Sequence, residues 1–173
     1  YTLAANVENL QVAPLWAYPG YVGFGGHVTG NDLDNIMRGN NGSDQFAGGA
    51  GNDRLFGNGY SDTLDGGLGN DTMFGGDGDD TYVVDAAGDR VVESSVSSAY
   101  NQATGTDMVI TSINYTLTVN VENLTLSGTG DLNGTGNALD NRIFANNGNN
   151  VLDGREGVDT LSYLGTVGAL TEI

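Results

Sequence analysis

Hydrophobic residues recur at every ninth position between Gly30 and Val92, each within a short strand-like triplet that follows a glycine-rich stretch. The chain divides here without a slip into seven nonapeptides: GNDLDNIMR, GNNGSDQFA, GGAGNDRLF, GNGYSDTLD, GGLGNDTMF, GGDGDDTYV and VDAAGDRVV. The eighth residue of each unit is apolar: Met37, Phe46, Leu55, Leu64, Met73, Tyr82 and Val91. A helix would send residues nine apart to opposite faces, and so much glycine opposes helix formation. The period therefore excludes helix.

The repeat fits a six-residue turn followed by a three-residue strand whose middle side chain points inward. Glycine supplies the positive φ that such turns need. Two units, 18 residues, complete one coil with a strand on each wall, and coils stack at the ~4.8 Å spacing of paired strands. The sequence thus predicts an all-β fold, a parallel β-roll (a β-helix solenoid) of stacked 18-residue coils with Ca²⁺ in the turns, for the reason that follows.

The sixth residue of each unit is an acid or its amide, and stacking places these residues in two ladders. One ladder is Asn35, Asp53, Asp71 and Asp89, and the other is Asp44, Asp62 and Asp80. Carboxylates stacked this closely repel one another unless a cation lies between them, and glycine turns expose backbone carbonyls to the same space. Such hard oxygen ligands suit Ca²⁺, which takes about six to eight of them. The 35/53 and 71/89 pairs depart most from the pattern.

The acidic composition of the chain limits the kinds of partner that it can bind. The chain has 173 residues, 22 acids against 5 basic residues, a formal charge of -17 and no cysteine. So acidic a surface repels phosphate backbones and anionic lipids, which argues against nucleic acid and membrane surfaces. No apolar run reaches the roughly 18 residues of a membrane span and no N-terminal signal peptide is visible. Because the chain begins at Tyr1, it is expected to be a segment of a larger parent chain.

The units GGAGNDRLF, GGLGNDTMF and GGDGDDTYV closely resemble the repeat G-G-x-G-x-D-x-U-x of the RTX (repeats-in-toxin, hemolysin-type) calcium-binding family. The resemblance is partial in GNNGSDQFA and GNGYSDTLD and weak in the two end units. It implies a parallel β-roll, calcium ligands from position-six Asp and turn carbonyls, and a host exported from Gram-negative bacteria by type I secretion. The expected location is therefore extracellular.

The predicted metal ligands follow from the ladders and from this resemblance. The side-chain candidates are Asp44, Asp53, Asp62, Asp71 and Asp80, with Asp89, Asn35 and Asp159 after them. The backbone-carbonyl candidates are Gly39, Asn41, Gly48, Ala50, Gly57, Gly59, Gly66, Leu68, Gly49, Gly51, Gly67, Gly69, Gly76 and Gly78. We expect about three to five Ca²⁺ ions in the first block and none or one in the second.

A longer repeat organises the rest of the chain. Tyr-Thr-Leu and Val-Glu-Asn-Leu occur at 1–10 and again at 115–124, and the GNxLDN of 30–35 returns at 136–141. The expected divisions are 1–29 (spacer strands and an aromatic insertion), 30–92 (first RTX block), 93–135 (degenerate coils and spacer strands) and 136–173 (degenerate second block). In the degenerate stretch, QATGTDMVI still puts Asp107 and Val109 at positions six and eight. In the second block Asn141, Asn150 and Asp159 take position six, and asparagine ladders without metal are the favoured interpretation.

Catalysis is not expected. His27 is the one histidine, and no H-E-x-x-H or G-x-S-x-G sequence occurs. The favoured function is a non-catalytic structural or secretion-associated module that folds on Ca²⁺ binding outside the cell. The alternatives are an accessory domain of a secreted lipase, protease or polysaccharide-modifying enzyme, and an adhesin or surface-layer repeat that binds a glycan.

Outward positions seven and nine differ between the walls, and one wall combines arginine with phenylalanine. It contains Arg54, Phe56, Phe74 and Arg90, and Arg142 beside Phe144 repeats the pairing. We hypothesise that this wall packs against another segment or a protein or glycan partner. The alternative is cover by the aromatic cluster of Trp16, Tyr18 and Tyr21, which is itself the candidate glycan site.

Overall fold

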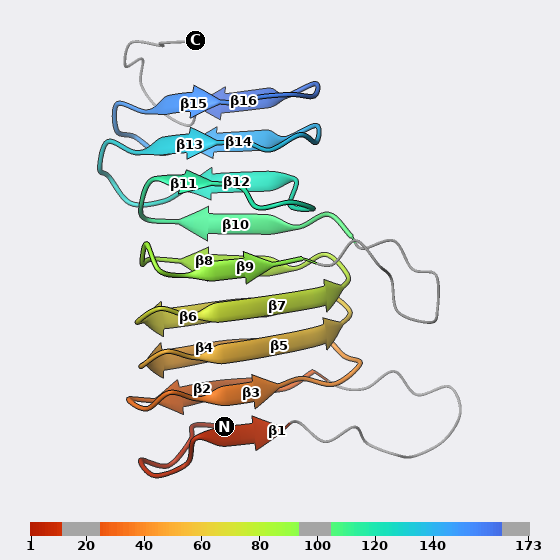
Figure 1. Cartoon of the computed structure of the whole chain (residues 1–173), viewed down its shortest axis with the longest axis vertical. Helices are drawn as coiled ribbons and strands as arrows, with labels where there is room; N and C mark the ends of the chain where they lie inside the picture. Colours follow the sequence, from red (N-terminus) through yellow and green to blue (C-terminus); the bar gives the residue numbers. More distant parts are fainter. Residues whose placement is uncertain (12–24, 94–104, 164–173) are drawn as a thin grey trace.

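The computed structural model describes residues 1–11, 25–93 and 105–163, and in these ranges the regular elements are all strands. The chain winds through about seven turns that stack along one axis, with the N-terminal coil at one end and the C-terminal coil at the other (Figure 1). The predicted all-β parallel roll of 18-residue coils is confirmed. The strands are β1 (Asn9–Gln11), β2 (His27–Asn31), β3 (Ile36–Arg38), β4 (Gln45–Ala50), β5 (Arg54–Gly59), β6 (Thr63–Leu68), β7 (Thr72–Asp77), β8 (Thr81–Val84), β9 (Arg90–Val92), β10 (Met108–Thr111), β11 (Tyr115–Thr116), β12 (Asn123–Leu126), β13 (Asn133–Thr135), β14 (Arg142–Ala145), β15 (Val151–Asp153) and β16 (Thr160–Tyr163).

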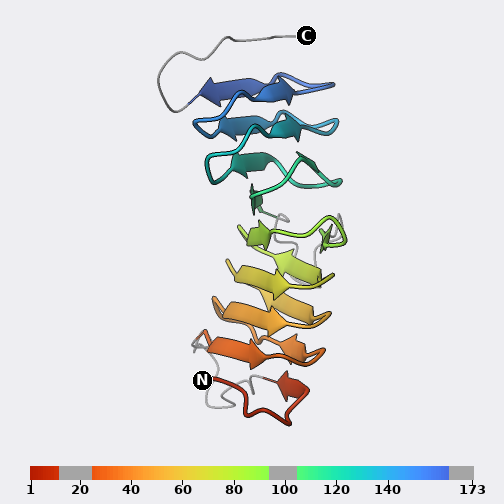
Figure 2. The same ribbon diagram turned by 90° about the vertical axis from the view of Figure 1, so that its left-hand side faces the viewer.

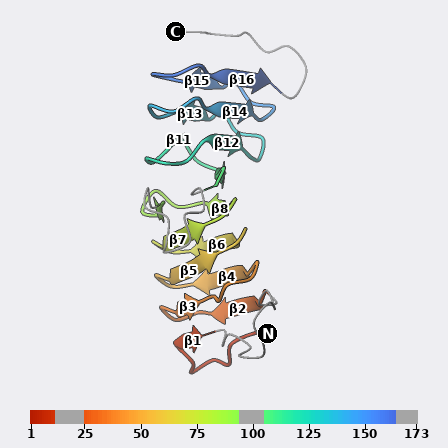
Figure 3. The same cartoon turned by 90° about the vertical axis from the view of Figure 1, so that its right-hand side faces the viewer.

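Two walls face each other across the roll. One wall is the sheet β1-β3-β5-β7-β9, continued further along by β11-β13-β15, and the other is the eight-stranded sheet from β2 to β16. Every pairing between described strands is parallel. Figures 2 and 3 show the stacked coils from the two sides. Leu55 pairs with Met37 in the coil before it and with Met73 in the coil after it. Within the repeat block, each unit therefore lies over the unit 18 residues away, as predicted.

The apolar position of each unit forms the core between the walls. Leu55, Leu64 and Met73 are all 0 % exposed, and Tyr82 is 0 % exposed as well. The residues on either side of each of these face outward and are exposed or half-buried. One inward apolar side chain per unit thus builds the core, because side chains alternate across a strand. Strands β4 to β7 are six residues long rather than the predicted three, because their pairing continues into the glycine-rich turn.

Four turns of the repeat block have left-handed backbone at positions two and four of the unit. Glycine occupies these positions in three turns: Gly49, Gly51, Gly67, Gly69, Gly76 and Gly78 all have positive φ. In GNGYSDTLD the same positions are Asn58 and Tyr60, which adopt φ of 81° and 70°. The glycine pattern therefore reflects backbone geometry, and the coil tolerates its loss at one turn.

The offset between paired strands changes after β9, from 18 residues to 27, and we call this place the change of step. Strand β10 pairs with β8, so that Met108 lies beside Thr81, and sheet β1-β3-β5-β7-β9 ends there. Counting in nines would have placed residues 108–110 on the wall of β9 instead. Val109 pairs with Tyr82 and is fully buried, which confirms its inward position. Most of the degenerate unit 93–101 lies outside the described residues.

Beyond this step the regular coil resumes. Ile143 pairs with Leu161, and Gly134 pairs with Leu152, again in parallel. The two Val-Glu-Asn-Leu segments contribute strands β1 and β12. Within the described ranges no helix is long and apolar enough to cross a membrane.

Candidate calcium sites in the turns

The position-six side chains point into the roll, and most of them are buried. Six in the repeat block and two after it are at most 2 % exposed: Asn35, Asp44, Asp53, Asp62, Asp71, Asp80, Asp107 and Asn141. Asp89 and Asp159 are half-buried. The predicted ladders are therefore present, with their carboxylates inside the roll rather than on its surface.

One oxygen of each carboxylate ties consecutive coils together. The backbone N–H of Asp44 donates to Oδ1 of Asp62 at 2.7 Å, and that of Asp62 donates to Oδ1 of Asp80 at 2.7 Å. In the other ladder, the N–H of Asp53 donates to Oδ1 of Asp71 at 2.7 Å. These charge-assisted bonds fix the spacing of the coils.

The second oxygen of most of these carboxylates has no partner. Buried Oδ2 atoms without a hydrogen bond belong to Asp53, Asp62, Asp71, Asp80 and Asp107. The ladder ends differ, because Oδ2 of Asp44 accepts the N–H of Asn40 at 2.9 Å. At the C-terminal end of the other ladder, Oδ2 of Asp89 accepts the N–H of Ala86 at 3.0 Å. An ionised carboxylate with one oxygen buried and unpartnered is costly, so the five central residues favour a bound cation.

A backbone carbonyl from the next coil faces the unpartnered oxygen. A Cβ added to Gly48 would clash with both Oδ2 of Asp53 and the carbonyl oxygen of Gly66, so these two oxygens approach one point. The same convergence occurs at Gly39, with Asp44 and Gly57, and at Gly57, with Asp62 and Gly75. Carboxylate and carbonyl oxygens around one small space are ligands that Ca²⁺ prefers, so these residues fit the ion.

The other predicted carbonyls lie elsewhere in the turns. A Cβ added to Gly67 in the next coil would clash with the carbonyl oxygen of Gly49, and one added to Gly69 would clash with that of Gly51. The carbonyl of Gly39 accepts a hydrogen bond from Asn58 Nδ2 at 3.0 Å. The structure thus brings the position-one carbonyls of Gly57, Gly66 and Gly75 to the carboxylates, whereas the position-one carbonyl of Gly39 is bonded to the Asn58 amide.

Burial changes the acidity of the ladder. Loss of hydration raises the pKa of Asp62 to about 8 and that of Asp80 to about 7, with neighbouring carboxylates adding to the effect. Burial likewise raises the pKa of Asp53 and of Asp71 to about 6 in each case. A backbone N–H bond opposes the shift in each of the four groups. Without metal, the carboxyls of the ladder therefore resist ionisation, and a bound cation would favour their ionised form.

Asparagine at position six produces a different arrangement. Nδ2 of Asn141 lies 3.3 Å from the carbonyl oxygen of Val121 and 3.2 Å from that of Glu122. Nδ2 of Asn137 donates to the same Val121 oxygen at 2.7 Å. An amide hydrogen here occupies carbonyl oxygens that a cation would otherwise use.

The same contacts recur at the N-terminal end of the repeat block. Nδ2 of Asn31 and Nδ2 of Asn35 both lie within hydrogen-bond distance of the Val7 carbonyl, at 2.9 and 3.3 Å. Oδ1 of Asn35 accepts the N–H of Asn31 at 3.0 Å. The repeated sequence GNxLDN after Val-Glu-Asn-Leu is thus a repeated hydrogen-bond network, which joins spacer strand to repeat block.

Acids outside the predicted ligand set extend one ladder. Oδ1 of Asp107 accepts the N–H of Asp80 at 2.8 Å, and Oε2 of Glu122 accepts the N–H of Asp107 at 2.8 Å. Asp107 was assigned to position six, and the acid before the apolar strand NLTL was the available signal for Glu122. Glu93, which joins Asp80 and Asp107, had no repeat signal because its unit is degenerate.

The outward wall of arginine and phenylalanine is also formed. Phe56 and Phe74 stack with ring centroids 4.6 Å apart, and the guanidinium carbon of Arg38 lies 3.9 Å from the Phe56 ring centre. In the second block Arg142 lies over Phe144 at 5.7 Å. The candidate aromatic cluster of Trp16, Tyr18 and Tyr21 lies outside the described residues. His27 is exposed, with Nδ1 3.2 Å from Oε1 of Gln45.

A parallel roll with carboxylates and carbonyls converging in its turns defines a calcium-binding repeat protein. The family model described as RTX calcium-binding nonapeptide repeat (4 copies) matches residues 29–59, 56–91 and 135–165. The chain belongs to this family, whose repeats are calcium-binding structural units and not catalytic ones. No curated protein and no solved structure matches the chain.

Proposed function

We propose that this chain is the calcium-dependent folding segment of a larger protein that Gram-negative bacteria export by type I secretion. In this proposal the segment is structural and carries no catalytic residue. It would stay extended where Ca²⁺ is scarce, inside the cell, and form the roll outside. The support for the extracellular location is that RTX repeats are typical of secreted bacterial proteins.

The observation that carries the proposal is the set of buried carboxylate oxygens without a hydrogen bond. Asp53, Asp62 and Asp71 each hold one oxygen on a backbone N–H and leave the other inside the roll. Without a cation, ionisation of these carboxyls opposes folding. With a cation bound, the same ionised carboxylates favour folding.

We assign the ligands of the first block to Asp44, Asp53, Asp62, Asp71 and Asp80, together with the position-one carbonyls. Asp89 lies at the end of its ladder, and Asn35 contributes an amide network, so the sites at these two positions would be the weakest. We propose about three to five ions in the first block. In the second block Asp159 accepts the N–H of Asn141 at 2.9 Å and is the one candidate we retain.

Each site would add roughly 2.7 kcal/mol of stability at a free Ca²⁺ concentration one hundred times the dissociation constant. Three sites or more would therefore contribute stability on the scale of a whole domain, about 5–15 kcal/mol. Folding coupled to binding at several stacked sites should be cooperative, because each coil forms its strand pairs on the coil before it.

Far-ultraviolet circular dichroism tests the proposal. The chain in chelator should show little β signal, and titration with Ca²⁺ should raise it cooperatively, while Mg²⁺ at the same concentrations should not. The double variant Asp53→Asn/Asp71→Asn should need more Ca²⁺ for the same signal. A chain already fully folded in chelator, with a spectrum unchanged by Ca²⁺, would rule out calcium-coupled folding.

A further inference from the structure

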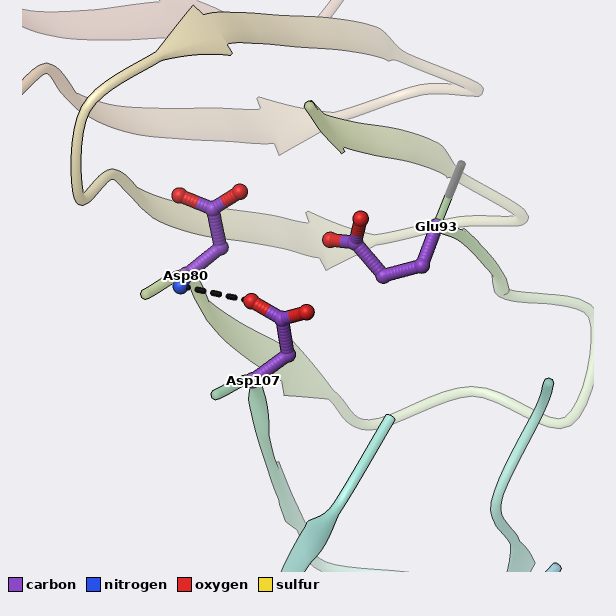
Figure 4. Close-up of side chains that lie close together, drawn as sticks. All are labelled: Asp80, Glu93 and Asp107. Atoms are coloured by element: carbon purple, nitrogen blue, oxygen red, sulfur yellow. Dashed lines mark hydrogen bonds between the residues drawn. The ribbon is translucent and has the colours of Figure 1, made fainter. Parts of the chain in front are cut away.

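Three carboxylates meet inside the roll where its step changes, between the first block and β10. Asp80, Glu93 and Asp107 each offer an oxygen, and these oxygens all lie within 4.8 Å of one another. The three residues are 1 %, 6 % and 0 % exposed. Figure 4 shows their side chains turned toward a common space, with the N–H of Asp80 bonded to Asp107.

Glu93 enters this space because of its place in the repeat. It follows β9 at position one, where most units of the repeat block have glycine. A Cβ at that position points at a position-six carboxylate, as the added Cβ on Gly48 and on Gly57 shows. A glutamate there therefore sends its side chain into the interior of the roll.

Glu93 also stands where a turn carbonyl stands in the regular coils. In those coils the oxygen facing Asp53 is the carbonyl of Gly66, and Glu93 follows Asp80 by the same number of positions. A Cβ on Gly75 would clash with Oδ2 of Asp80 and with Oε1 of Glu93. The two carboxylate oxygens thus converge as carboxylate and carbonyl do in the turns below, with an additional negative charge.

Two further oxygens complete the set. Oδ2 of Asp107, like Oδ2 of Asp80, is buried without a hydrogen-bond partner. The hydroxyl of Tyr82, which is 0 % exposed, donates to Oε1 of Glu93 and also lies beside the Cβ position of Gly75. The unpartnered oxygens on residues this deeply buried indicate a ligand between them.

No basic side chain of the protein is buried in the roll to neutralise this charge. All five arginines, Arg38, Arg54, Arg90, Arg142 and Arg155, are exposed, and the chain has no lysine. Three buried carboxylates need either protons or a cation. An all-oxygen set with high charge selects a hard divalent cation.

We propose that Asp80, Glu93 and Asp107 form a further site for a hard divalent cation of the Ca²⁺ class, outside the nonapeptide pattern. The site would join the end of β9 to the starts of β8 and β10, and so fasten the second half of the roll to the first across the change of step. It extends the calcium binding proposed above, but its glutamate ligand belongs to no turn site.

The test counts the ions bound per chain by equilibrium dialysis with Ca²⁺. Glu93→Gln keeps the size of the side chain and removes one charge, and we expect this variant to lose one ion, or to bind it at least about tenfold more weakly. Glu8→Gln is the matched control, because Glu8 is exposed and its loss should leave the count unchanged. Circular dichroism at saturating Ca²⁺ verifies that each variant forms the roll.

A second variant separates this proposal from the calcium binding of the repeats. Asp53→Asn/Asp71→Asn alters the other ladder, and it should lose turn ions while retaining the ion that Glu93→Gln removes. If Glu93→Gln binds as many ions as the wild type with equal affinity while the double variant loses ions, the site at the step is wrong and the repeat sites stand. If neither variant loses an ion, both proposals are wrong.

A readout near the site adds an independent check. Tb³⁺ bound at this site would be excited by the Tyr82 ring, since that hydroxyl touches Glu93. Tyr82→Phe should lower tyrosine-sensitised luminescence in the wild-type background and have no further effect in Glu93→Gln. An equal loss in both backgrounds would place the luminescent ion elsewhere and contradict the assignment.

Discussion

The backbone N–H of Asp62 donates to Oδ1 of Asp80 across 2.7 Å, while Oδ2 of Asp80 is buried without a hydrogen bond. The two oxygens of one carboxylate therefore have separate roles. One sets the distance between coils, and the other faces the interior where oxygens converge. The roll uses the carboxylate for its geometry, and burial penalises the charge of that carboxylate unless a cation is bound.

The first prediction concerns pH in the absence of metal. Burial raises the pKa of Asp62 to about 8 and that of Asp53 to about 6. When the pKa of a carboxyl is higher in the folded state, its contribution to stability is fully present at a pH below the pKa of the unfolded state, roughly 3.9. That contribution is lost as the pH rises through the pKa of the folded state. In chelator, the β signal in circular dichroism should therefore be larger at about pH 5 than at about pH 8.

Calcium should reverse this dependence. Ion binding requires ionised carboxylates, so the apparent Ca²⁺ affinity should rise with pH over the same range. Circular dichroism in chelator and Ca²⁺ titrations at each pH measure the two effects. A metal-free chain that loses β structure on acidification from neutral pH would show that the ladder carboxyls are not destabilised by burial.

The second prediction compares two glycines of strand β5. A methyl group on Gly57 would clash with Oδ2 of Asp62 and the carbonyl of Gly75, whereas one on Gly59 would meet only Oδ1 of Asn41 at 3.9 Å. Gly57→Ala should lower stability in Ca²⁺ by about 1–3 kcal/mol and weaken ion binding. Gly59→Ala is the control and should be close to neutral.

Urea unfolding at fixed Ca²⁺ measures this difference. Neither glycine has positive φ, so backbone strain does not separate the two variants. Equal effects of the two alanines would show that the space beside Asp62 is not a ligand site.

The sequence was enough to predict the regular part of the roll and not its change of step. Asp44, Asp62 and Asp80 are in phase, and a fixed period leaves one stacking geometry, so their ladder followed from counting. The backbone hydrogen bond to each Oδ1 did not follow, because the period fixes which residues stack and not how their side chains turn. Glu93 was not predicted for a different reason: position one is glycine in most units, so the repeat assigns no side chain to it. The pairing of β10 with β8, which brings Asp107 beside Asp80, depends on tertiary contacts.

The third prediction separates the outward wall from ion binding. Phe56 and Phe74 stack outside the roll, on the far side of the strands from the carboxylates. Arg54→Glu with Phe56→Ser should therefore leave the number of bound ions and their affinity unchanged within about twofold, since exposed charges are screened by solvent. Calorimetric titration with Ca²⁺ measures both quantities. A large loss of affinity would end the hypothesis that this wall is a separate docking face.

The last prediction concerns the asparagine network of the second block. Asn141 is 1 % exposed, and its Nδ2 donates toward the carbonyls of Val121 and Glu122. Asn141→Asp removes these donors and places a carboxylate oxygen against two carbonyl oxygens, which should cost about 1–3 kcal/mol locally. Asn147→Asp, at an exposed position of the following turn, is the matched control.

Hydrogen exchange of β12 and β14 at saturating Ca²⁺ gives a local measurement while the first block is folded. Asn141→Asp should accelerate exchange in both strands, because the bonds that join these coils are lost, and Asn147→Asp should not. Exchange that is unchanged or slower in Asn141→Asp would mean that an aspartate recruits a cation at this position. The second block would then be able to bind an ion as the first block does, and asparagine at position six would lower its affinity for that ion.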